Sequence, residues 1–374
     1  MTVKSLEIQL YPSCQLHLGS GVFALLPDYC RSLNKRFVII SDTQVPEETV
    51  FGVRNLLEKA ELDVRVFYFP AGEIHKTRET KERLENHLLD WRYGRDTCLL
   101  ALGGGVATDL IGFLASTYCR GIPVIYLPTT LLAMVDASIG GKTGVNTYHG
   151  KNLIGSFYQP LAVFMDTDVL KTLPPEQWSN GVVEIIKHAL IANAELFQKL
   201  QTSVGSLKTD PQLLLDIIHE SCLIKKNIVE SDEKESGLRQ WLNYGHTIGH
   251  AVESLEEYRL GHGEAVAIGL LVETKLSIEA GFLAASVLRD LEKLLTAYQL
   301  PLKTAAFQNR KALLHQLKGD KKSKAGEARF VMLDRMGSAR MVDDTYAFPI
   351  ERTMLERVLN WAAERFGETK EEKK

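Results

Sequence analysis

The sequence has none of the features that mark membrane-spanning or disulfide-stabilised proteins. No uninterrupted apolar run approaches the length of about 18 residues that a transmembrane helix needs. The N-terminus alternates apolar and polar residues like a strand and lacks the apolar core and cleavage site of a signal peptide. The five cysteines are scattered and form no Cys-x-x-Cys pair, which indicates reduced thiols rather than a disulfide framework or a zinc ribbon. We therefore expect a cytoplasmic protein without a membrane partner.

The chain also lacks an excess of charge of either sign. Its formal net charge is -3, with 24% charged and 45% hydrophobic residues, which is typical of a globular protein and gives no reason to expect a nucleic-acid partner. A length of 374 residues is too great for one ordinary hydrophobic core. The sequence therefore suggests two domains, and no internal repeat is visible.

Two common nucleotide-binding signatures are absent as well. The turn at residues 103–105 is Gly-Gly-Gly, which does not have the Gly-x-Gly-x-x-Gly spacing of an ordinary Rossmann domain. The stretch 141–143, Gly-Lys-Thr, looks like part of a P-loop, but Ala137 and Asp136 stand four and five positions before Gly141, so the first glycine of a P-loop is missing. An ATPase is therefore not indicated.

The first half of the chain contains a regular alternation of strand and helix patterns. The connections between them are short, as in a parallel sheet with crossover helices. The predicted strands are residues 36–42, 64–69, 98–102 and 124–127, and the predicted helices are 47–62, 79–91 and a segment from about 107.

After about residue 175 the strand patterns nearly vanish and amphipathic helical patterns dominate. One exception is a small hairpin predicted from residues 328–333 and 338–342. We therefore expect an α/β nucleotide-binding domain with a parallel sheet at 1–175, followed by a mostly α-helical domain at 176–374.

A candidate phosphate-binding loop follows the strand at 98–102. That strand runs into the triple-glycine turn and then a helix, which together offer backbone N–H groups and a helix N-terminus to a pyrophosphate. Asp42, at the end of an earlier strand, is a candidate for a ribose hydroxyl. The turn alone could simply be a tight turn. Support comes from the glycine-rich segment 136–152, whose Lys142, Lys151 and Asn152 suit an anionic or phosphorylated ligand.

The highest density of metal-ligating residue types lies around residues 246–262. His246 and His250 are spaced i, i+4 and share a face if the segment is helical, and His262 follows a glycine-containing turn. Such a cluster suits a divalent transition metal such as zinc with one position left open for substrate. The metalloprotease pattern is excluded because Thr247 stands where its general-base Glu would be. Three merely structural histidines remain an alternative.

Glu184 is a further candidate, because it interrupts an otherwise apolar helical pattern. An unpaired carboxylate is costly to bury, so Glu184 is predicted to be a metal ligand or a member of an ion pair. The plainer alternative is a surface pair with Lys187, three residues along the helix.

Several longer motifs resemble the 3-dehydroquinate synthase family of the sugar-phosphate cyclase superfamily. They occur in order over nearly the whole chain and carry the resemblance at residues 103–109 (GGGVATD), 128–132 (PTTLL), 135–146 (VDASIGGKTGVN), 150–155 (GKNLIG), 171–175 (KTLPP), 242–251 (LNYGHTIGHA) and 262–267 (HGEAVA).

The resemblance implies an NAD- and metal-dependent carbon-oxygen lyase with zinc or cobalt, usually a homodimer. Such an enzyme converts 3-deoxy-D-arabino-heptulosonate 7-phosphate into 3-dehydroquinate and phosphate in the shikimate pathway, which leads to chorismate and the aromatic amino acids. The family's metal ligands correspond to Glu184, His246 and His262. Helical spacing alone favours His250 as a metal ligand beside His246. The resemblance instead makes His262 the second histidine ligand and places His250 near the substrate phosphate.

The resemblance also implies the other functional positions. Cofactor contacts correspond to Asp42, Glu73, Lys76, Gly104, Gly105, Asp109, Thr129, Thr130, Lys142, Lys151 and Thr172. Substrate or catalytic contacts correspond to Arg120, Asp136, Lys142, Asn152, Lys187, Lys225, Arg239, Asn243, His250 and Lys321, with Lys322 as the alternative to Lys321. Arg120 is expected to reach the site of a neighbouring subunit.

Two rival classes share this general architecture. Sister cyclases, which make deoxy-scyllo-inosose or an epi-valiolone, act on substrates without a carboxylate and would have no use for the carboxylate-binding fork of Arg239. A metal-dependent polyol dehydrogenase would perform net oxidation and would not need the phosphate pocket expected from Lys142, Asn152 and Lys321. A non-catalytic NAD-binding protein would have lost metal ligands, and none is missing here.

Overall fold

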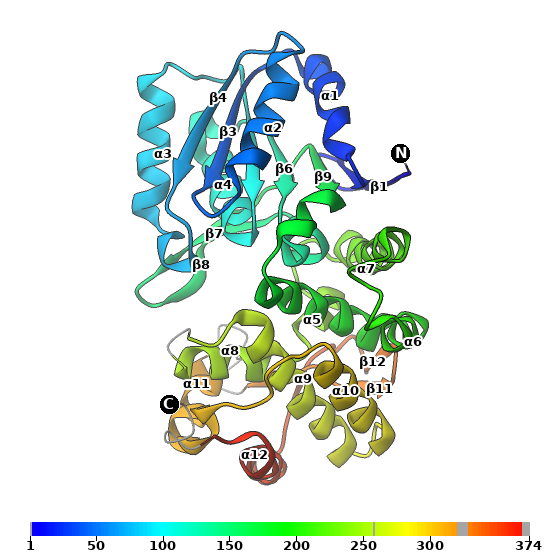
Figure 1. Ribbon diagram of the computed structural model, residues 1–374. Helices are drawn as coiled ribbons and strands as arrows, with labels where there is room; N and C mark the ends of the chain where they lie inside the picture. Colours follow the sequence, from blue (N-terminus) through cyan, green and yellow to red (C-terminus); the bar gives the residue numbers. More distant parts are fainter. Residues whose placement is uncertain (1, 257–258, 320–327, 369–374) are drawn as a thin grey trace. The chain divides into compact units, whose positions relative to one another are not determined.

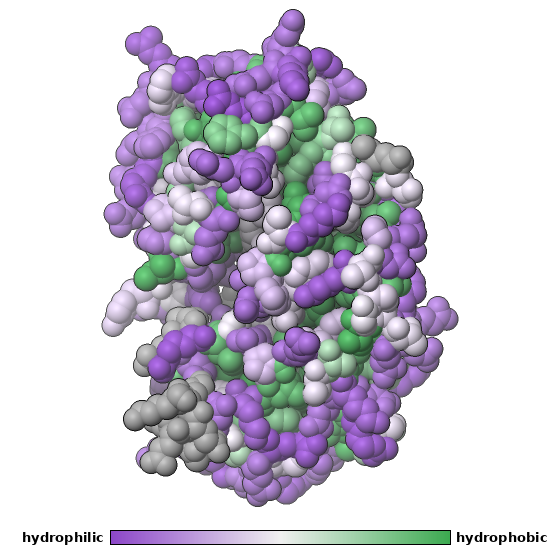
Figure 2. All heavy atoms as spheres, in the orientation of Figure 1, coloured by the Kyte–Doolittle hydropathy of each residue, from purple (hydrophilic) through white to green (hydrophobic). Residues whose placement is uncertain are grey.

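A computed structural model of the chain describes residues 2–256, 259–319 and 328–368 (Figure 1). These residues form two compact units. The first comprises residues 1–177 together with 211–230, and the second comprises 178–210 together with 231–374. Hydrophilic side chains predominate on the face drawn in Figure 2. Among the described residues, none of the helices combines the length and the apolar composition that crossing a bilayer requires.

The first unit is built on a seven-stranded sheet with the order β1-β2-β9-β6-β5-β3-β4. All neighbours pair in parallel except β1 and β2, which form an antiparallel edge. The strands are β1 (Val3–Ile8), β2 (Cys14–Gly19), β3 (Arg36–Asp42), β4 (Val64–Phe69), β5 (Thr97–Gly103), β6 (Val124–Pro128) and β9 (Ala162–Asp166). The predicted parallel α/β architecture is thus confirmed, whereas β2 and β9 have no counterpart among the predicted strands.

The central strands are apolar along their whole length because both faces of the sheet are covered. One face of β3, with Phe37 and Ile39, belongs to a buried cluster that includes residues of α1 and α2. Val38 and Ile40 on the other face are buried too. The helices of this part are α1 (Leu26–Leu33), α2 (Glu47–Glu58), α3 (Arg78–Asp90) and α4 (Gly105–Thr117). Of these, α4 packs against β5 and β6 and also contacts α3.

Two further elements complete the first unit. The strands β7 (Lys142–Thr147) and β8 (Gly150–Phe157) form an antiparallel hairpin that contacts α4. The helix α7 (Pro211–Ser231) returns to this unit from later in the chain. Its Asp216 forms an ion pair with Lys4 at 2.6 Å, and its Glu230 accepts a hydrogen bond from the N–H of Gln9 at 2.6 Å.

The second unit is mostly helical, as predicted for this half of the chain. Its helices are α5 (Pro175–Ala192, from Trp178 onward), α6 (Ala194–Ser203), α8 (His246–Leu255), α9 (His262–Glu279), α10 (Ala285–Ala297), α11 (Arg310–Gly319) and α12 (Arg352–Phe366). The strands β11 (Leu333–Arg335) and β12 (Ser338–Ala339) form the predicted hairpin. The preceding strand β10 (Arg329–Phe330) pairs instead with β13 (Phe348–Pro349), so the hairpin is shorter than predicted.

Candidate metal and cofactor sites

Glu184 lies on α5, a helix whose residues from Gly181 to Ile191 are all buried. Its side chain is 0% exposed and forms an ion pair with the ammonium group of Lys187, which is buried as well. The structure therefore excludes the alternative of a surface pair. The carboxylate oxygen Oε1 accepts no hydrogen bond from any described residue. A buried carboxylate with one oxygen left over requires a further cationic or donor partner.

His246 is the first residue of α8, and its ring is held by the backbone before it. Its Nδ1 lies 3.2 Å from the carbonyl oxygen of Tyr244. Because a carbonyl oxygen can only accept, this contact places the proton on Nδ1. The lone pair of Nε2 is then available, and Nε2 lies 3.5 Å from Glu184 Oε1.

His262 is the first residue of α9 and approaches the same oxygen. Its Nε2 lies 3.8 Å from Glu184 Oε1, and its Nδ1 faces the buried carboxylate of Glu253 at 3.6 Å. The start of α9 is fixed by Asn180 on α5, whose Oδ1 accepts the N–H of Gly263 at 2.9 Å. Outer partners of this kind orient a ligating imidazole and fix its tautomer.

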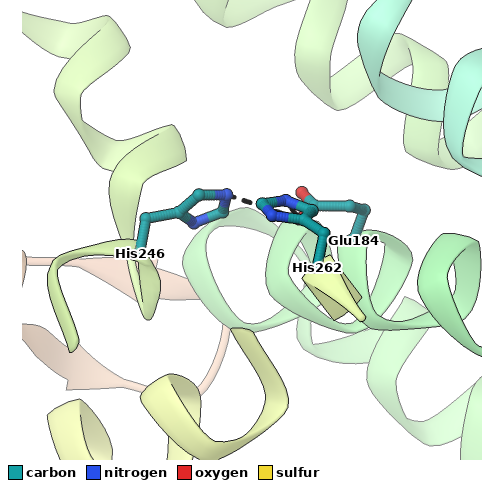
Figure 3. A group of neighbouring side chains, drawn as sticks. All are labelled: Glu184, His246 and His262. Carbon is teal, nitrogen blue, oxygen red and sulfur yellow. Dashed lines mark ion pairs between the residues drawn. The ribbon is translucent and has the colours of Figure 1, made fainter. Parts of the chain in front are cut away.

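The three side chains converge from three helices (Figure 3). Their donor atoms all lie within 4.8 Å of one another. In a tetrahedral zinc site, donor atoms about 2.1 Å from the ion lie about 3.4 Å apart. The separations around Glu184 Oε1 are close to that value, and the donors are one carboxylate and two imidazoles. These residues therefore fit a divalent transition metal with a fourth position left for a substrate oxygen.

Close packing of α8 on α9 brings the two histidines together. A Cβ atom at Gly269 would come within 1.9 Å of the Gly245 carbonyl oxygen, and one at Gly249 would lie 3.2 Å from that of Ala265. Gly245 itself has φ +80, a conformation that favours glycine. The glycines of the 242–251 motif are thus explained by the backbone approach that they permit.

His250, which helical spacing had favoured as a ligand, lies one turn along α8 from His246. Its ring centre is 5.4 Å from that of His246 and 6.2 Å from that of His262. Among the described residues of the second unit, the group of three donors contains His262 rather than His250. The i, i+4 spacing puts His250 on the same face without bringing it to Glu184.

Arg239 and Asn243 lie on a short helical turn, Leu238–Asn243, that leads into α8. Arg239 is only 1% exposed, and its guanidinium donates to the backbone carbonyl of Glu233. The loop before it is folded around Asp232, which accepts backbone N–H groups of Ser236, Gly237 and Arg239 at 2.7–3.1 Å. Burial opposes ionisation of Asp232, but these hydrogen bonds lower its pKa overall. Asn243 donates to Glu235 Oε1 at 2.6 Å.

In the first unit, the glycine turn, Asp42 and Thr129 gather at the carboxyl ends of β3, β5 and β6. A Cβ atom at Gly103 would lie 3.0 Å from Asp42 Oδ2, and the N–H of Thr129 donates to the Gly103 carbonyl at 2.9 Å. Burial raises the pKa of Asp42, against the lowering effect of the Gln44 and Val45 N–H groups. Gly104 caps α4 and Gly105 begins it, so backbone N–H groups are presented as expected for a pyrophosphate site.

Lys76, Asp109 and Glu73 form a charged group beside this edge. Lys76 is buried and pairs with Asp109, and its Nζ lies 3.9 Å from Glu73 Oε1. Burial raises the pKa of Asp109, and the Lys76 ammonium acts in the opposite direction. Glu73 and Lys76 are three residues apart in the sequence, and the structure brings Asp109, 33 residues after Lys76, to them.

Asn146 holds this charged group to the β7–β8 hairpin and was not among the predicted site residues. Its Nδ2 donates to Glu73 Oε1 at 2.7 Å, its N–H donates to the Lys76 carbonyl at 2.8 Å, and its Oδ1 accepts the N–H of Asn152 at 3.0 Å. Asn146 was visible as the last residue of the 135–146 motif. Only the tertiary contacts reveal that it links a cofactor candidate, Glu73, to a substrate candidate, Asn152.

The remaining candidates of the first unit are more dispersed. Lys225 on α7 is buried and donates to Asp136 Oδ1 at 2.5 Å and to the Asp136 carbonyl at 2.6 Å. The others lie on turns, strand ends and the hairpin, and comprise the exposed Arg120, Lys142, Asn152 and Thr172 and the partly buried Thr130 and Lys151. Lys321 and Lys322 lie outside the described residues.

Comparisons with known proteins show what this chain is similar to. Residues 66–180 match the family described as 3-dehydroquinate synthase N-terminal, and residues 181–323 match 3-dehydroquinate synthase C-terminal. A curated relative, a 3-dehydroquinate synthase of Nostoc punctiforme, is 42% identical over 347 residues, which cover 91% of this chain and 93% of the relative.

Two solved structures are similar over almost the whole chain at 27% identity. One is a 2-deoxy-scyllo-inosose synthase complexed with carbaglucose-6-phosphate, NAD+ and Co2+, with a TM-score of 0.87 over 96% of this chain and 99% of that chain. The other is a 2-epi-5-epi-valiolone synthase from Streptomyces hygroscopicus subsp. jinggangensis with NAD+ and Zn2+ bound, with a TM-score of 0.84 over 98% and 99%.

Proposed function

The chain belongs to the 3-dehydroquinate synthase family, and on that premise we propose that it converts 3-deoxy-D-arabino-heptulosonate 7-phosphate into 3-dehydroquinate and phosphate. The observation that carries this proposal is the combination, within one unit, of the Glu184–His246–His262 donor group and the buried Arg239. Through a bound metal, the donor group can bind substrate hydroxyl groups, and the guanidinium of Arg239 can bind a substrate carboxylate.

We assign NAD to the residues around the glycine turn and a zinc or cobalt ion to Glu184, His246 and His262. When bound, these groups supply reversible hydride transfer and polarisation of neighbouring substrate hydroxyls, so that the reaction has no net redox change. The bound NAD+ and Co2+ or Zn2+ of the two similar cyclases support the assignment.

The chain's own residues bind and orient the substrate. Arg239 is proposed to hold the substrate carboxylate in fork geometry, with Asn243 one helical turn away. Its burial and the folded loop around Asp232 preorganise the guanidinium, so less conformational freedom is lost when the substrate binds.

By the resemblance of the motifs alone, Lys142, Asn152, His250 and Lys321 are proposed as phosphate-binding positions. No dedicated strong base is evident among these residues, and we propose that the departing phosphate itself takes the proton when it is eliminated. Lys187 forms an ion pair with Glu184, and Lys225 forms one with Asp136, so each lysine offsets the charge of a carboxylate.

The second candidate function is that of a sister cyclase acting on a substrate without a carboxylate. Its fold is nearly the same, as the TM-scores show, but sequence identity is 27% for the solved cyclases and 42% for the curated 3-dehydroquinate synthase. A buried arginine in this position has no partner in such a substrate. Both arguments favour 3-dehydroquinate synthase.

The decisive experiment measures phosphate release by the purified protein with NAD, before and after treatment with a chelator and after addition of Zn2+ or Co2+. Release from 3-deoxy-D-arabino-heptulosonate 7-phosphate that requires metal, forms dehydroquinate and leaves no net NADH supports the proposal. Release from sedoheptulose 7-phosphate or glucose 6-phosphate instead would identify a sister cyclase. Accumulation of NADH with a simple polyol would identify a dehydrogenase.

We further propose that the chain acts as a cytoplasmic homodimer in which Arg120 reaches the neighbouring subunit's site. Arg120 is exposed at the end of a turn with φ +70, so its side chain is available for a partner. Light scattering at micromolar concentration tests the dimer, and mixing inactive variants of Arg120 and His246 tests the sharing of sites by restored activity.

A further inference from the structure

The helix that carries His246 begins without a cap of its own. The residue before α8 is Gly245, which has no side chain to accept the N–H groups of the first turn. These N–H groups have no partner within the helix and are costly to leave unpaired in a buried position. The ligand His246 lies in this first turn, so whatever satisfies the turn also decides how rigidly the ligand is held.

A buried glutamate of the neighbouring helix takes over the capping role. Glu273, on α9, is 0% exposed. Its Oε2 accepts the N–H of Gly245 at 2.8 Å, and its Oε1 accepts the N–H of Ile248 at 3.2 Å. The two N–H groups stand on either side of His246 in the chain. The negative charge also lies at the positive end of the helix dipole of α8.

The next residue of α9 holds the backbone that precedes Gly245. Thr274 Oγ1 lies 2.5 Å from the hydroxyl oxygen of Tyr244, and both side chains are buried. The carbonyl of that same Tyr244 orients the His246 ring through Nδ1. Glu273 and Thr274, two consecutive residues of α9, thus fix the chain before and after His246. The other candidate histidine ligand, His262, is the first residue of the same helix.

We propose that Glu273 is a positioning residue that presents His246 to the metal. The inference rests on the proposed metal site and adds a role to a residue outside it. The carboxylate holds the first turn of α8 in register with α9, so the two imidazoles keep the separation that one ion requires. Replacing an outer partner of this kind typically lowers metal affinity by about 10- to 100-fold.

The test uses the full-length protein and the metal ions alone. Zn2+ affinity is measured by competition titration, and the ligand-field absorption of bound Co2+ reports the geometry of the site, for wild type, Glu273→Gln and His246→Ala. Glutamine keeps the volume but has only one acceptor oxygen, so one of the two N–H groups loses its partner. We expect Glu273→Gln to bind Zn2+ about 10- to 100-fold more weakly and to change the Co2+ spectrum.

Glu256 provides a matched control. It is another buried glutamate of the same unit, and its Oε1 accepts the hydroxyl of Thr304 at 2.6 Å and the N–H of Ala305 at 2.8 Å. Glutamine keeps the one oxygen that accepts both contacts, and Glu256→Gln is expected to leave Zn2+ affinity and the Co2+ spectrum as in wild type. A merely structural role for Glu273 would make the two variants behave alike.

The possible outcomes separate the inference from the function on which it rests. Wild-type affinity in Glu273→Gln, with loss of binding in His246→Ala, overturns the positioning role alone. Equal Zn2+ binding by wild type and His246→Ala overturns the metal site and the inference with it. If Glu273→Gln does not fold, Glu273→Asp takes its place, because its shorter side chain withdraws the carboxylate from the N–H groups of Gly245 and Ile248. Unchanged affinity and spectrum there would also overturn the inference.

Discussion

The two units hold their candidate residues in different ways. In the second unit, Glu184, His246 and His262 lie on helices. Their partners are Lys187 on the same helix, the Tyr244 carbonyl just before α8 and Glu253 on α8, respectively. In the first unit, most candidates lie on turns, strand ends and a hairpin, and several are exposed, among them Lys142 and Asn152. Metal coordination tolerates little error in donor position, whereas a large ligand is held by many contacts from adaptable loops.

The two units also differ in the role of their glycines. Around α8 and α9, glycines allow two backbones to approach more closely than side chains would permit, as at Gly269. At the carboxyl ends of the strands, Gly104 and Gly105 instead leave N–H groups accessible to a ligand. The same residue type thus serves packing in one unit and, in the proposed cofactor site, binding in the other.

The largest effect is expected from removing a metal ligand of the second unit. His246→Ala leaves only two donors, and we expect kcat to fall by more than about a thousandfold, since the metal contributes several kcal/mol to catalysis. Metal analysis of the purified variant should show a loss of bound zinc. Wild-type metal content with a normal rate would refute the assignment.

A smaller effect is expected from Arg239, which we propose binds substrate rather than metal. Arg239→Ala should raise KM by about 10- to 100-fold, the usual value of a charge-assisted hydrogen bond, with bound metal unchanged. Arg239→Lys should lie in between, because it keeps the charge but loses the fork. Arg352→Ala, which removes an exposed arginine, is the control. An unchanged KM in Arg239→Ala would remove the main argument against a sister cyclase.

In the first unit, Asn146→Ala should weaken NAD binding by about tenfold, because Glu73 loses a donor and Asn152 loses an acceptor. Calorimetric titration with NAD measures the effect, and metal affinity should stay at its wild-type value. Asn309→Ala removes an asparagine of the second unit whose Oδ1 accepts the N–H of Ala312, and serves as control. Equal NAD affinity in wild type and Asn146→Ala would show that the hairpin does not support the cofactor turn.

The smallest effects concern stability and compare a close-packed glycine with an open one. Gly269→Ala forces a Cβ atom against the Gly245 carbonyl and should lower the free energy of unfolding by about 1–3 kcal/mol. Gly52→Ala in α2 meets no atom within 4 Å and should raise it by about 0.5–1 kcal/mol. Urea denaturation measures both changes. A neutral Gly269→Ala would mean that α8 and α9 are not held by backbone contact.

The sequence predicted those parts of the fold that depend on local pattern. The strands 36–42 and 64–69 begin and end where predicted. The first is a buried apolar run bounded by polar residues, and the second is an edge strand rich in β-branched and aromatic residues. The strand β9 is equally buried but was not predicted, since only its place between β2 and β6 distinguishes it from any short apolar segment. The antiparallel edge formed by β1 and β2 likewise depends on long-range pairing.

In the candidate sites too, the sequence predicted what depends on local pattern and missed what depends on long-range contacts. The cluster of histidines was visible as a pattern, but helical spacing could not choose between His250 and His262, because it defines a face and not a distance to Glu184. Glu273 left no signal in the sequence, and Asn146 was visible only as the last residue of the 135–146 motif, without its role. Their contacts join segments 25 to 28 and 73 residues apart, respectively, and such contacts follow from packing rather than from periodicity.

The return of α7 to the first unit has a consequence for synthesis of the chain. Residues 1–177 emerge from the ribosome first, yet the partners of Lys4 and Gln9 lie on residues 216 and 230. The N-terminal part must therefore wait for about 50 further residues, at about 5–20 residues per second, before its last helix can dock. A single cut cannot divide the gene into two independently folding halves, because each unit is made from two separate stretches of chain.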